Sequence, residues 1–198
     1  MTHLYLIRHA RTAWNLEERN QGWADIPLDA VGQQQARLLA ERLSSTHFDA
    51  IYSSPLLRSR QTAEVLAAAH GLEVRLDGRL RERDLGQWTG LTFDDARLGW
   101  PERFEGDWRL HGPPGGEGQA SLVARADAAL DDCLAAYPEG TLAVVSHGGI
   151  LSAYLGHVLG IPIERPASFS FQNAAFARVS IQAASGSDPM VRLLSLGE

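Results

Sequence analysis

The chain has 198 residues, one cysteine and a formal charge of −6 from 18 basic and 24 acidic side chains. This length predicts a single domain over residues 1–198, the acidic balance argues against nucleic acid as a partner, and the lone Cys133 excludes an internal disulfide. The sequence has no apolar run of transmembrane length, and its first residues resemble a strand rather than a signal peptide. We therefore expect no membrane partner and a cytoplasmic location.

The first part of the chain alternates strand and helix patterns. The apolar run of residues 4–7 predicts a buried strand whose carboxyl end presents Arg8 and His9. Asp29 is placed to cap a helix, and Ser54-Pro55 has the order typical of a helix start. The elements expected after this strand are a helix at 30–43, a strand at 48–53, a helix from 54 to 69 that stops at Gly71, and a short strand at 72–76. Such alternation predicts parallel strands joined by right-handed crossovers.

The regular pattern breaks between Arg79 and Gln119. This stretch holds a short predicted helix near residues 92–98, a Gly-Pro cluster at 112–118, and Trp88, Trp100 and Trp108. We interpret residues 79–119 as a cap segment with a small core of its own, in preference to tryptophans that stack directly on a substrate. A cap above the sheet edge would shape the specificity pocket.

The last third of the chain predicts two helices and three strands. The first helix spans residues 121–137, with Cys133 on its apolar face as a small core residue. The apolar run of 141–145 leads to His147, two glycines and an amphipathic helix that ends at Gly160. Residues 174–181 and 190–196 predict strands joined by a turn at 185–189. The expected fold is a three-layer α/β/α domain with a mostly parallel central sheet and an antiparallel edge strand.

His9 and His147 both follow apolar runs, so both should reach the carboxyl edge of the sheet, where open α/β sheets bind ligands. The glycine pair after His147 is expected to leave backbone N–H groups open to an anion at a helix start. A local positive pocket on an acidic protein suits a small anionic substrate. The basic residues expected near it are Arg8, Arg11, Arg58 and Arg60.

Several short motifs occur in a characteristic order. Residues 8–15 read Arg-His-Ala-Arg-Thr-Ala-Trp-Asn, and further motifs follow at 22–23, 28–36, 54–63, 82–90 and 146–148. Together they resemble the histidine phosphatase (phosphoglycerate-mutase-like) superfamily, in particular its α-ribazole and broad-specificity phosphatases. The resemblance implies a phosphoglycerate-mutase-like fold. Two positions depart from the family pattern: Ala10 stands where glycine is usual, and Gly118 ends a run that usually reads Gly-Glu-Ser.

The resemblance also implies a role for each core residue in phosphoryl transfer. His9 would attack phosphorus as a neutral imidazole and form a phosphohistidine. Arg8 and Arg58 would hold the phosphoryl oxygens, and His147 would donate a hydrogen bond to the phosphoryl group. Glu82 would protonate the leaving alkoxide and then deprotonate the attacking water.

Other candidate residues are less determined. Asp84 is the alternative acid if the register of the motif shifts by two residues. Thr12 and Asn15 are either donors to the phosphoryl oxygens or loop-capping side chains, and both interpretations stay open. The remaining candidate phosphate contacts are Gln21, Gly22 and Gly148.

The other histidines (His3, His47, His70, His111 and His157) lack metal-ligand spacing, so we expect no metal and no cofactor. The sequence therefore predicts a metal-independent phosphomonoester hydrolase for a small-molecule phosphate. One alternative is a cofactor-dependent phosphoglycerate mutase, although such mutases carry a longer insertion than the 64 residues, 83–146, between Glu82 and His147. A second alternative is a catalytically silent module that binds a phosphorylated ligand. A homodimer also stays open.

Overall fold

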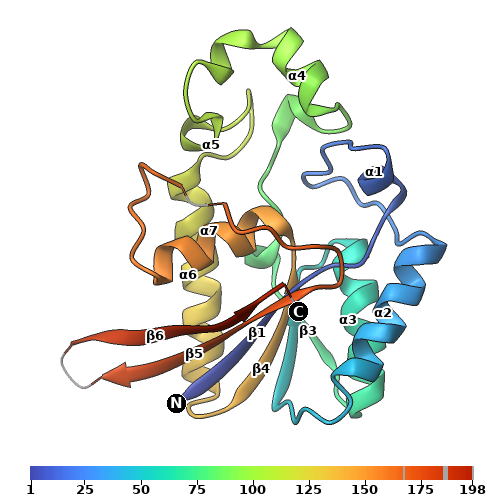
Figure 1. The fold of residues 1–198 in the computed structure, drawn as a ribbon, viewed down its shortest axis with the longest axis vertical. Coiled ribbons are helices and arrows are strands. Elements are labelled where there is room, and N and C mark those ends of the chain that lie inside the picture. The colour runs from blue at the N-terminus through green and yellow to red at the C-terminus, as the bar shows by residue number, and fades with distance from the viewer. Residues whose placement is uncertain (167, 185–186, 198) are drawn as a thin grey trace.

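The computed structural model describes residues 1–166, 168–184 and 187–197 (Figure 1). A six-stranded sheet runs through it in the order β3-β2-β4-β1-β5-β6. The strands are β1 (Thr2–Arg8), β2 (Ala50–Ser53), β3 (Val74–Leu76), β4 (Thr141–Ser146), β5 (Phe176–Ala184) and β6 (Ser187–Leu196). Strands β3, β2, β4 and β1 are parallel, and β5 and β6 pair antiparallel at one edge. The predicted mixed α/β sheet is confirmed.

Helices cover both faces of the sheet (Figure 1). The α-helices are α1 (Ala13–Leu16), α2 (Ala30–Arg42), α3 (Leu57–His70), α4 (Phe93–Gly99), α5 (Trp108–His111), α6 (Gln119–Ala136) and α7 (Gly148–Val158). Three short 3₁₀ helices are η1 (Gly78–Leu80), η2 (Gly86–Trp88) and η3 (Pro101–Phe104). None of the helices in the described ranges is both long enough and apolar enough to span a bilayer.

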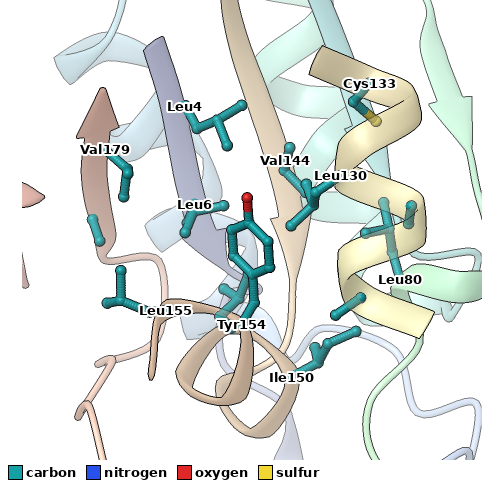
Figure 2. Packing of buried hydrophobic residues seen from close by; sticks show 14 of the residues in the cluster. Leu4, Leu6, Leu80, Leu130, Cys133, Val144, Ile150, Tyr154, Leu155 and Val179 are labelled. Atoms are coloured by element: carbon teal, nitrogen blue, oxygen red, sulfur yellow. The ribbon is translucent and has the colours of Figure 1, made fainter. Parts of the chain in front are cut away.

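Successive residues of β1 pack on opposite faces of the sheet, as the period of a strand requires. Leu4 and Leu6 join a core with α6 and α7, whereas Ile7 joins a second core with α2 and α3. Figure 2 shows Tyr154 and Cys133 among the residues of the first core. Burial there raises the pKa of the Cys133 thiol to about 12, so Cys133 is a core residue, as predicted.

Two helix starts differ in how well the sequence predicts them. Asp29 caps α2 as predicted, because its carboxylate accepts the N–H of Gly32. The predicted start of α3 at Ser54 is wrong: this helix begins at Leu57 and its first N–H donates to Asp25. The Ser54 hydroxyl instead lies 2.9 Å from the ring nitrogen Nε2 of His147, the residue before α7.

Gly118 precedes α6 because no side chain fits there. A Cβ at this position would lie 2.7 Å from the carbonyl oxygen of Leu110. The departure from the usual serine therefore reflects a close approach of two backbones, and α6 begins without a side-chain cap.

The described part of the predicted 185–189 turn is already strand. Strand β6 starts at Ser187, three residues before the predicted start, and pairs with β5. Ser185 and Gly186 lie outside the described residues.

The segment of residues 79–119 lies beyond the carboxyl edge of the parallel strands, where α4 and α5 stand above the sheet (Figure 1). It holds a small core of Leu85, Trp88 and Ala96, on which Trp100, Phe104 and Trp108 pack. Trp88 is fully buried and stacks on Phe104 with ring centroids 5.0 Å apart. Trp108 packs on Trp88 and also lines a cavity between this segment and the sheet.

Candidate active site

A cavity of about 410 Å³ lies between the carboxyl edge of the sheet and the segment of residues 79–119. Most of the predicted site residues share this cavity as lining. They are Arg8, His9, Asn15, Gln21, Gly22, Arg58, Glu82 and Gly148. The sheet order explains why they meet, since β4 lies between β1 and β2 and so brings His147 and Arg58 next to His9.

His9 is buried directly after β1, and its ring has one determined tautomer. Its Nδ1 is 2.7 Å from the carbonyl oxygen of Ala10, and because a carbonyl only accepts, Nδ1 carries the proton. Its Nε2 accepts a hydrogen bond from Arg58 Nε at 3.3 Å and therefore holds the lone pair. Burial, together with the charges of Arg58 and Arg8, holds the pKa of His9 well below its usual range. The ring is a neutral imidazole with a nucleophilic Nε2.

Of the two predicted phosphate-binding arginines, Arg58 is fully buried and Arg8 half-buried, and carbonyl oxygens hold both. Arg58 donates from Nη1 to Ala24 and from Nη2 to Gly22, both at 2.8 Å. Arg8 donates from Nη1 to Phe171 at 2.6 Å, while its Nε is buried and has no partner among the described residues. These bonds fix the direction of each guanidinium without neutralising its charge.

His147 is fully buried, and the centroid of its ring lies 5.2 Å from that of His9. Its Nε2 is 2.9 Å from Ser54 Oγ, and its Nδ1 is buried without a partner among the described residues. Burial, with the charge of Arg58 next in size, holds the pKa of His147 well below its usual range. The ring is neutral and has one hydrogen-bonding atom to spare.

Glu82 lies across the cavity and bonds to the start of α7. Its carboxylate accepts the N–H groups of Arg83, Gly149 and Ile150 at 2.7, 3.0 and 3.1 Å. The expectation that the glycine pair leaves these N–H groups open is therefore wrong at Gly149, because the carboxyl group of Glu82 accepts its N–H. A Cβ on Gly149 would lie 2.5 Å from Oε1 of Glu82, so any other residue there would require this carboxylate to shift.

The fallback acid Asp84 has a structural role in this arrangement. Its carboxylate accepts the N–H of Gly86 at 2.9 Å, and it is absent from the cavity lining. The geometry therefore favours Glu82 over Asp84 as the group that reaches a bound substrate.

The loop candidates divide between the two readings left open by the sequence. Thr12 and Asn15 form a reciprocal helix cap, in which Thr12 Oγ1 accepts the N–H of Asn15 and Asn15 Oδ1 accepts the N–H of Thr12. Thr12 is fully buried by this cap, whereas Asn15 also lines the cavity. Gly22, with φ of +47°, contributes its carbonyl oxygen to Arg58, and Gln21 lines the wall beside it.

Two arginines expected in the pocket lie elsewhere. Arg11 pairs with Asp29, the cap of α2, at 2.9 Å, and the exposed Arg60 approaches Glu64 of α3 at 3.5 Å. Both arginines therefore pair with carboxylates outside the cavity. Their places in the cavity wall are taken by residues that the sequence reasoning did not single out. These are Arg19, Arg83 and Arg109, together with Phe93 and Phe169.

Within the described ranges, no group of three or more His, Cys, Asp or Glu side chains is arranged to hold a metal ion.

A comparison with protein families identifies the superfamily of the chain. A model described as the histidine phosphatase superfamily (branch 1) matches residues 4–187. The chain belongs to this superfamily. A curated relative, a probable phosphoglycerate mutase GpmB of Enterobacter sp. (strain 638), is 38% identical over 186 residues, which cover 92% of this chain and 86% of the relative.

Solved structures of other histidine phosphatase relatives share the fold along the whole chain. A mycobacterial glucosyl-3-phosphoglycerate phosphatase in complex with VO3 is 31% identical, with a TM-score of 0.90 and 98% of each chain covered. A mutant phosphoserine phosphatase from Entamoeba histolytica in complex with phosphoserine is 29% identical, with a TM-score of 0.85, and covers 100% of this chain and 97% of its own.

Ala10 occupies the position where the histidine phosphatase signature usually has glycine. Its side chain is fully buried in a small cluster with Leu28 and Ala36, and its N–H donates to Thr62 Oγ1 at 3.0 Å. The extra methyl group therefore packs beneath the loop, and the carbonyl of Ala10 remains available to His9.

Proposed function

We propose that this histidine phosphatase is a phosphomonoester hydrolase that needs no metal ion and forms a phosphohistidine at His9. The observation that carries the proposal is a neutral His9 Nε2 lone pair surrounded by buried donors. One of those donors, Arg8 Nε, has no acceptor in the described part of the chain, and the buried ring nitrogen Nδ1 of His147 has no partner there either. Buried polar groups without partners are costly, and a phosphoryl oxygen would satisfy Arg8 Nε, and also His147 Nδ1 where that nitrogen carries the ring proton.

The reaction divides into two displacements at phosphorus. In the first, His9 Nε2 forms a bond to phosphorus as the bond to the ester oxygen breaks, and Glu82 gives its proton to the leaving alkoxide. In the second, water attacks phosphorus, Glu82 takes the proton of that water, and phosphate leaves with His9 restored. Arg8 and Arg58 hold the equatorial oxygens throughout, because planar guanidinium groups match phosphate geometry.

The substrate is proposed to be a small phosphorylated metabolite. The cavity of about 410 Å³ accommodates more than a phosphoryl group, and its outer wall is lined by Phe93, Trp108 and Phe169. Two structurally similar proteins are named as phosphatases of glucosyl-3-phosphoglycerate and phosphoserine, both of which are small molecules. A cytoplasmic location fits a metabolite substrate and stays a prediction.

The test is hydrolysis of p-nitrophenyl phosphate with and without EDTA, together with acid-quench trapping of labelled phosphoenzyme. We expect wild type to turn over and to trap label regardless of EDTA, and His9→Ala to do neither. His157→Ala is the matched control, because His157 is a surface residue of α7 that pairs with Asp127. Turnover that is lost with EDTA, or that persists in His9→Ala, would reject the proposed mechanism. Binding of phosphoesters without any turnover would instead identify a silent binding module.

A second function, phosphoglycerate mutase, is favoured by one observation, the 38% identity to a probable phosphoglycerate mutase. Both reactions use the same phosphohistidine, so they differ in whether water or a second phosphoglycerate accepts the phosphoryl group. Incubation with 3-phosphoglycerate and bisphosphoglycerate separates them. We expect release of inorganic phosphate, whereas formation of 2-phosphoglycerate without phosphate release would identify a mutase.

A further inference from the structure

Ser54 connects β2 to the loop before α3 and is fully buried. Its Oγ accepts the N–H of Leu56 at 3.3 Å and lies 2.9 Å from His147 Nε2. Among the described residues, His147 Nε2 is the acceptor within reach of the Ser54 hydroxyl hydrogen. A buried hydroxyl group is expected to donate as well as accept. The hydroxyl hydrogen therefore points at His147.

We propose that Ser54 is a positioning residue for phosphoryl transfer, because its hydroxyl donates to Nε2 of His147 and so keeps the ring proton on Nδ1. A neutral imidazole carries a single N–H, and the partner of one nitrogen decides which nitrogen bears it. With Nε2 accepting from Ser54, Nδ1 becomes the donor. The proposal rests on the proposed function, since it assigns this donor to a phosphoryl oxygen.

The arrangement is the counterpart of the one at His9. There a carbonyl oxygen accepts from Nδ1, which leaves a bare Nε2 to attack phosphorus. At His147 a hydroxyl donates to Nε2, which leaves a protonated Nδ1 without a partner in the described part of the structure. The two rings thus hold the same tautomer and use opposite atoms, one as nucleophile and the other as donor.

The alternative tautomer would work against the reaction. If Nε2 carried the proton and donated to Ser54, Nδ1 would offer a lone pair to the negatively charged phosphoryl oxygens and repel them. Burial, with the charge of Arg58 next in size, lowers the pKa of His147, so a doubly protonated ring does not supply the missing donor.

The test compares Ser54→Ala with Ser53→Ala. Ser53 is as fully buried as Ser54, but its hydroxyl contacts the Ser54 carbonyl and Ser59 Oγ and does not contact His147. Two quantities are measured: the protonated ring nitrogen of His147, by long-range ¹H–¹⁵N correlation with assignment from His147→Asn, and kcat/KM for p-nitrophenyl phosphate. Ser54→Thr, which keeps the hydroxyl, serves as the rescue variant.

We expect Nδ1 to be protonated and Nε2 bare in the wild type. In Ser54→Ala this preference is lost and kcat/KM falls about 10- to 100-fold, by analogy with removal of the hydrogen-bond partners of metal-ligating histidines. Ser53→Ala keeps the tautomer and most of the activity, and Ser54→Thr recovers most of both.

Three results would overturn the proposal: a wild-type ring protonated at Nε2, an unchanged tautomer in Ser54→Ala, or an equal loss of activity in both alanine variants. If Ser54→Ala does not fold, the wild-type spectrum and Ser54→Thr still decide. Because the spectrum needs no turnover, a wild type inactive on every phosphoester would reject the proposed function and leave the Ser54 test in force.

Discussion

At the scale of single residues, the site separates charged groups from neutral ones at close range. Burial lowers the pKa of Arg58 to about 10, which still leaves its guanidinium protonated near neutral pH. The same surroundings hold His9 and His147 neutral. Positive charge therefore comes from the arginines, while the imidazoles keep a lone pair and an N–H for chemistry. This division is what attack on a phosphate dianion requires.

Glu82 is the residue whose role separates substrates by leaving group. In Glu82→Gln the amide cannot deliver a proton, so alkyl phosphates, which leave as unstable alkoxides, should slow by about 10²–10⁴-fold. p-Nitrophenyl phosphate should slow far less, because nitrophenolate leaves without protonation. The measurement is kcat/KM across a series of leaving groups. Asp84→Asn is the matched control, and an equal loss for all leaving groups would remove Glu82 from the role of acid.

The residue scale also shows where sequence reasoning succeeds. His9 and Arg58 follow motifs that suffice to place them in the cavity. Arg11 and Arg83 carry the same charge but lie in different places. Arg11 pairs with Asp29 outside the cavity, whereas Arg83 lines the cavity. The order Ser54-Pro55 predicts a helix cap, because serine before proline is typical of a helix start. Its bond to His147 joins residues 93 positions apart, and no local pattern signals it.

At the scale of elements, the start of α7 binds Glu82, the proposed acid. The N–H groups of its first turn donate to the Glu82 carboxylate. The backbone carbonyl of Glu82 also accepts hydrogen bonds from Trp23 Nε1 and Arg125 Nη2, each at 2.7 Å. Glu82 is thus fixed at both ends, by a helix terminus on one side and by two side chains on the other. A substitution in α7 should then affect the acid without touching it.

Gly149→Ala makes this expectation testable. Alanine normally stabilises a helix by up to about 1 kcal/mol relative to glycine. Here its Cβ would lie 2.5 Å from Glu82 Oε1 and displace the carboxylate. We expect kcat/KM for alkyl phosphates to fall at least about tenfold, with a smaller loss for p-nitrophenyl phosphate, as for removal of the acid itself.

The control for Gly149→Ala is Gly99→Ala at the end of α4, where a Cβ would meet no atom within 4 Å. That variant should keep wild-type kinetics. If Gly149→Ala also keeps them, the bond between α7 and Glu82 is not needed for catalysis.

Elements were predictable to the extent that one face of each is apolar. The periodicity of residues 121–137 places α6 to within two residues, and the apolar run ending at Ile7 places β1. The start of α3 was missed because it depends on Asp25, in a loop with no periodicity. Gly118 was noticed as unusual, but the reason, the nearby carbonyl of Leu110, comes from a different segment.

At the scale of the whole molecule, strand order decides what the site contains. The apolar runs predict parallel strands but do not state that β4 inserts between β1 and β2. That insertion sets His147 beside His9 and lets the Ser54 hydroxyl reach it from β2. The overall charge of −6 likewise does not indicate that five arginines line one cavity. They are Arg8, Arg19, Arg58, Arg83 and Arg109.

Burial of two neutral histidines also couples the stability of the whole domain to pH. Both have folded-state pKa values well below the value of 6.5 expected in the unfolded chain. As the pH falls below about 6.5, the unfolded state takes up protons that the folded state refuses. The contribution of each histidine is therefore fully present above about pH 6.5 and is lost as the pH falls, by up to about 1.4 kcal/mol per pH unit.

His147→Asn isolates one of these contributions. The variant should have a lower free energy of unfolding than the wild type at pH 7, but its decline between pH 7 and about pH 5.5 should be smaller by about 1 kcal/mol. Urea unfolding followed by tryptophan fluorescence in phosphate-free buffer measures both. Carboxylates titrate alike in the two proteins, so the difference between their slopes belongs to the missing imidazole. Parallel curves for the two proteins would mean that His147 takes up protons alike in the folded and unfolded states, and the claim that burial holds its ring neutral as the pH falls would have to be abandoned.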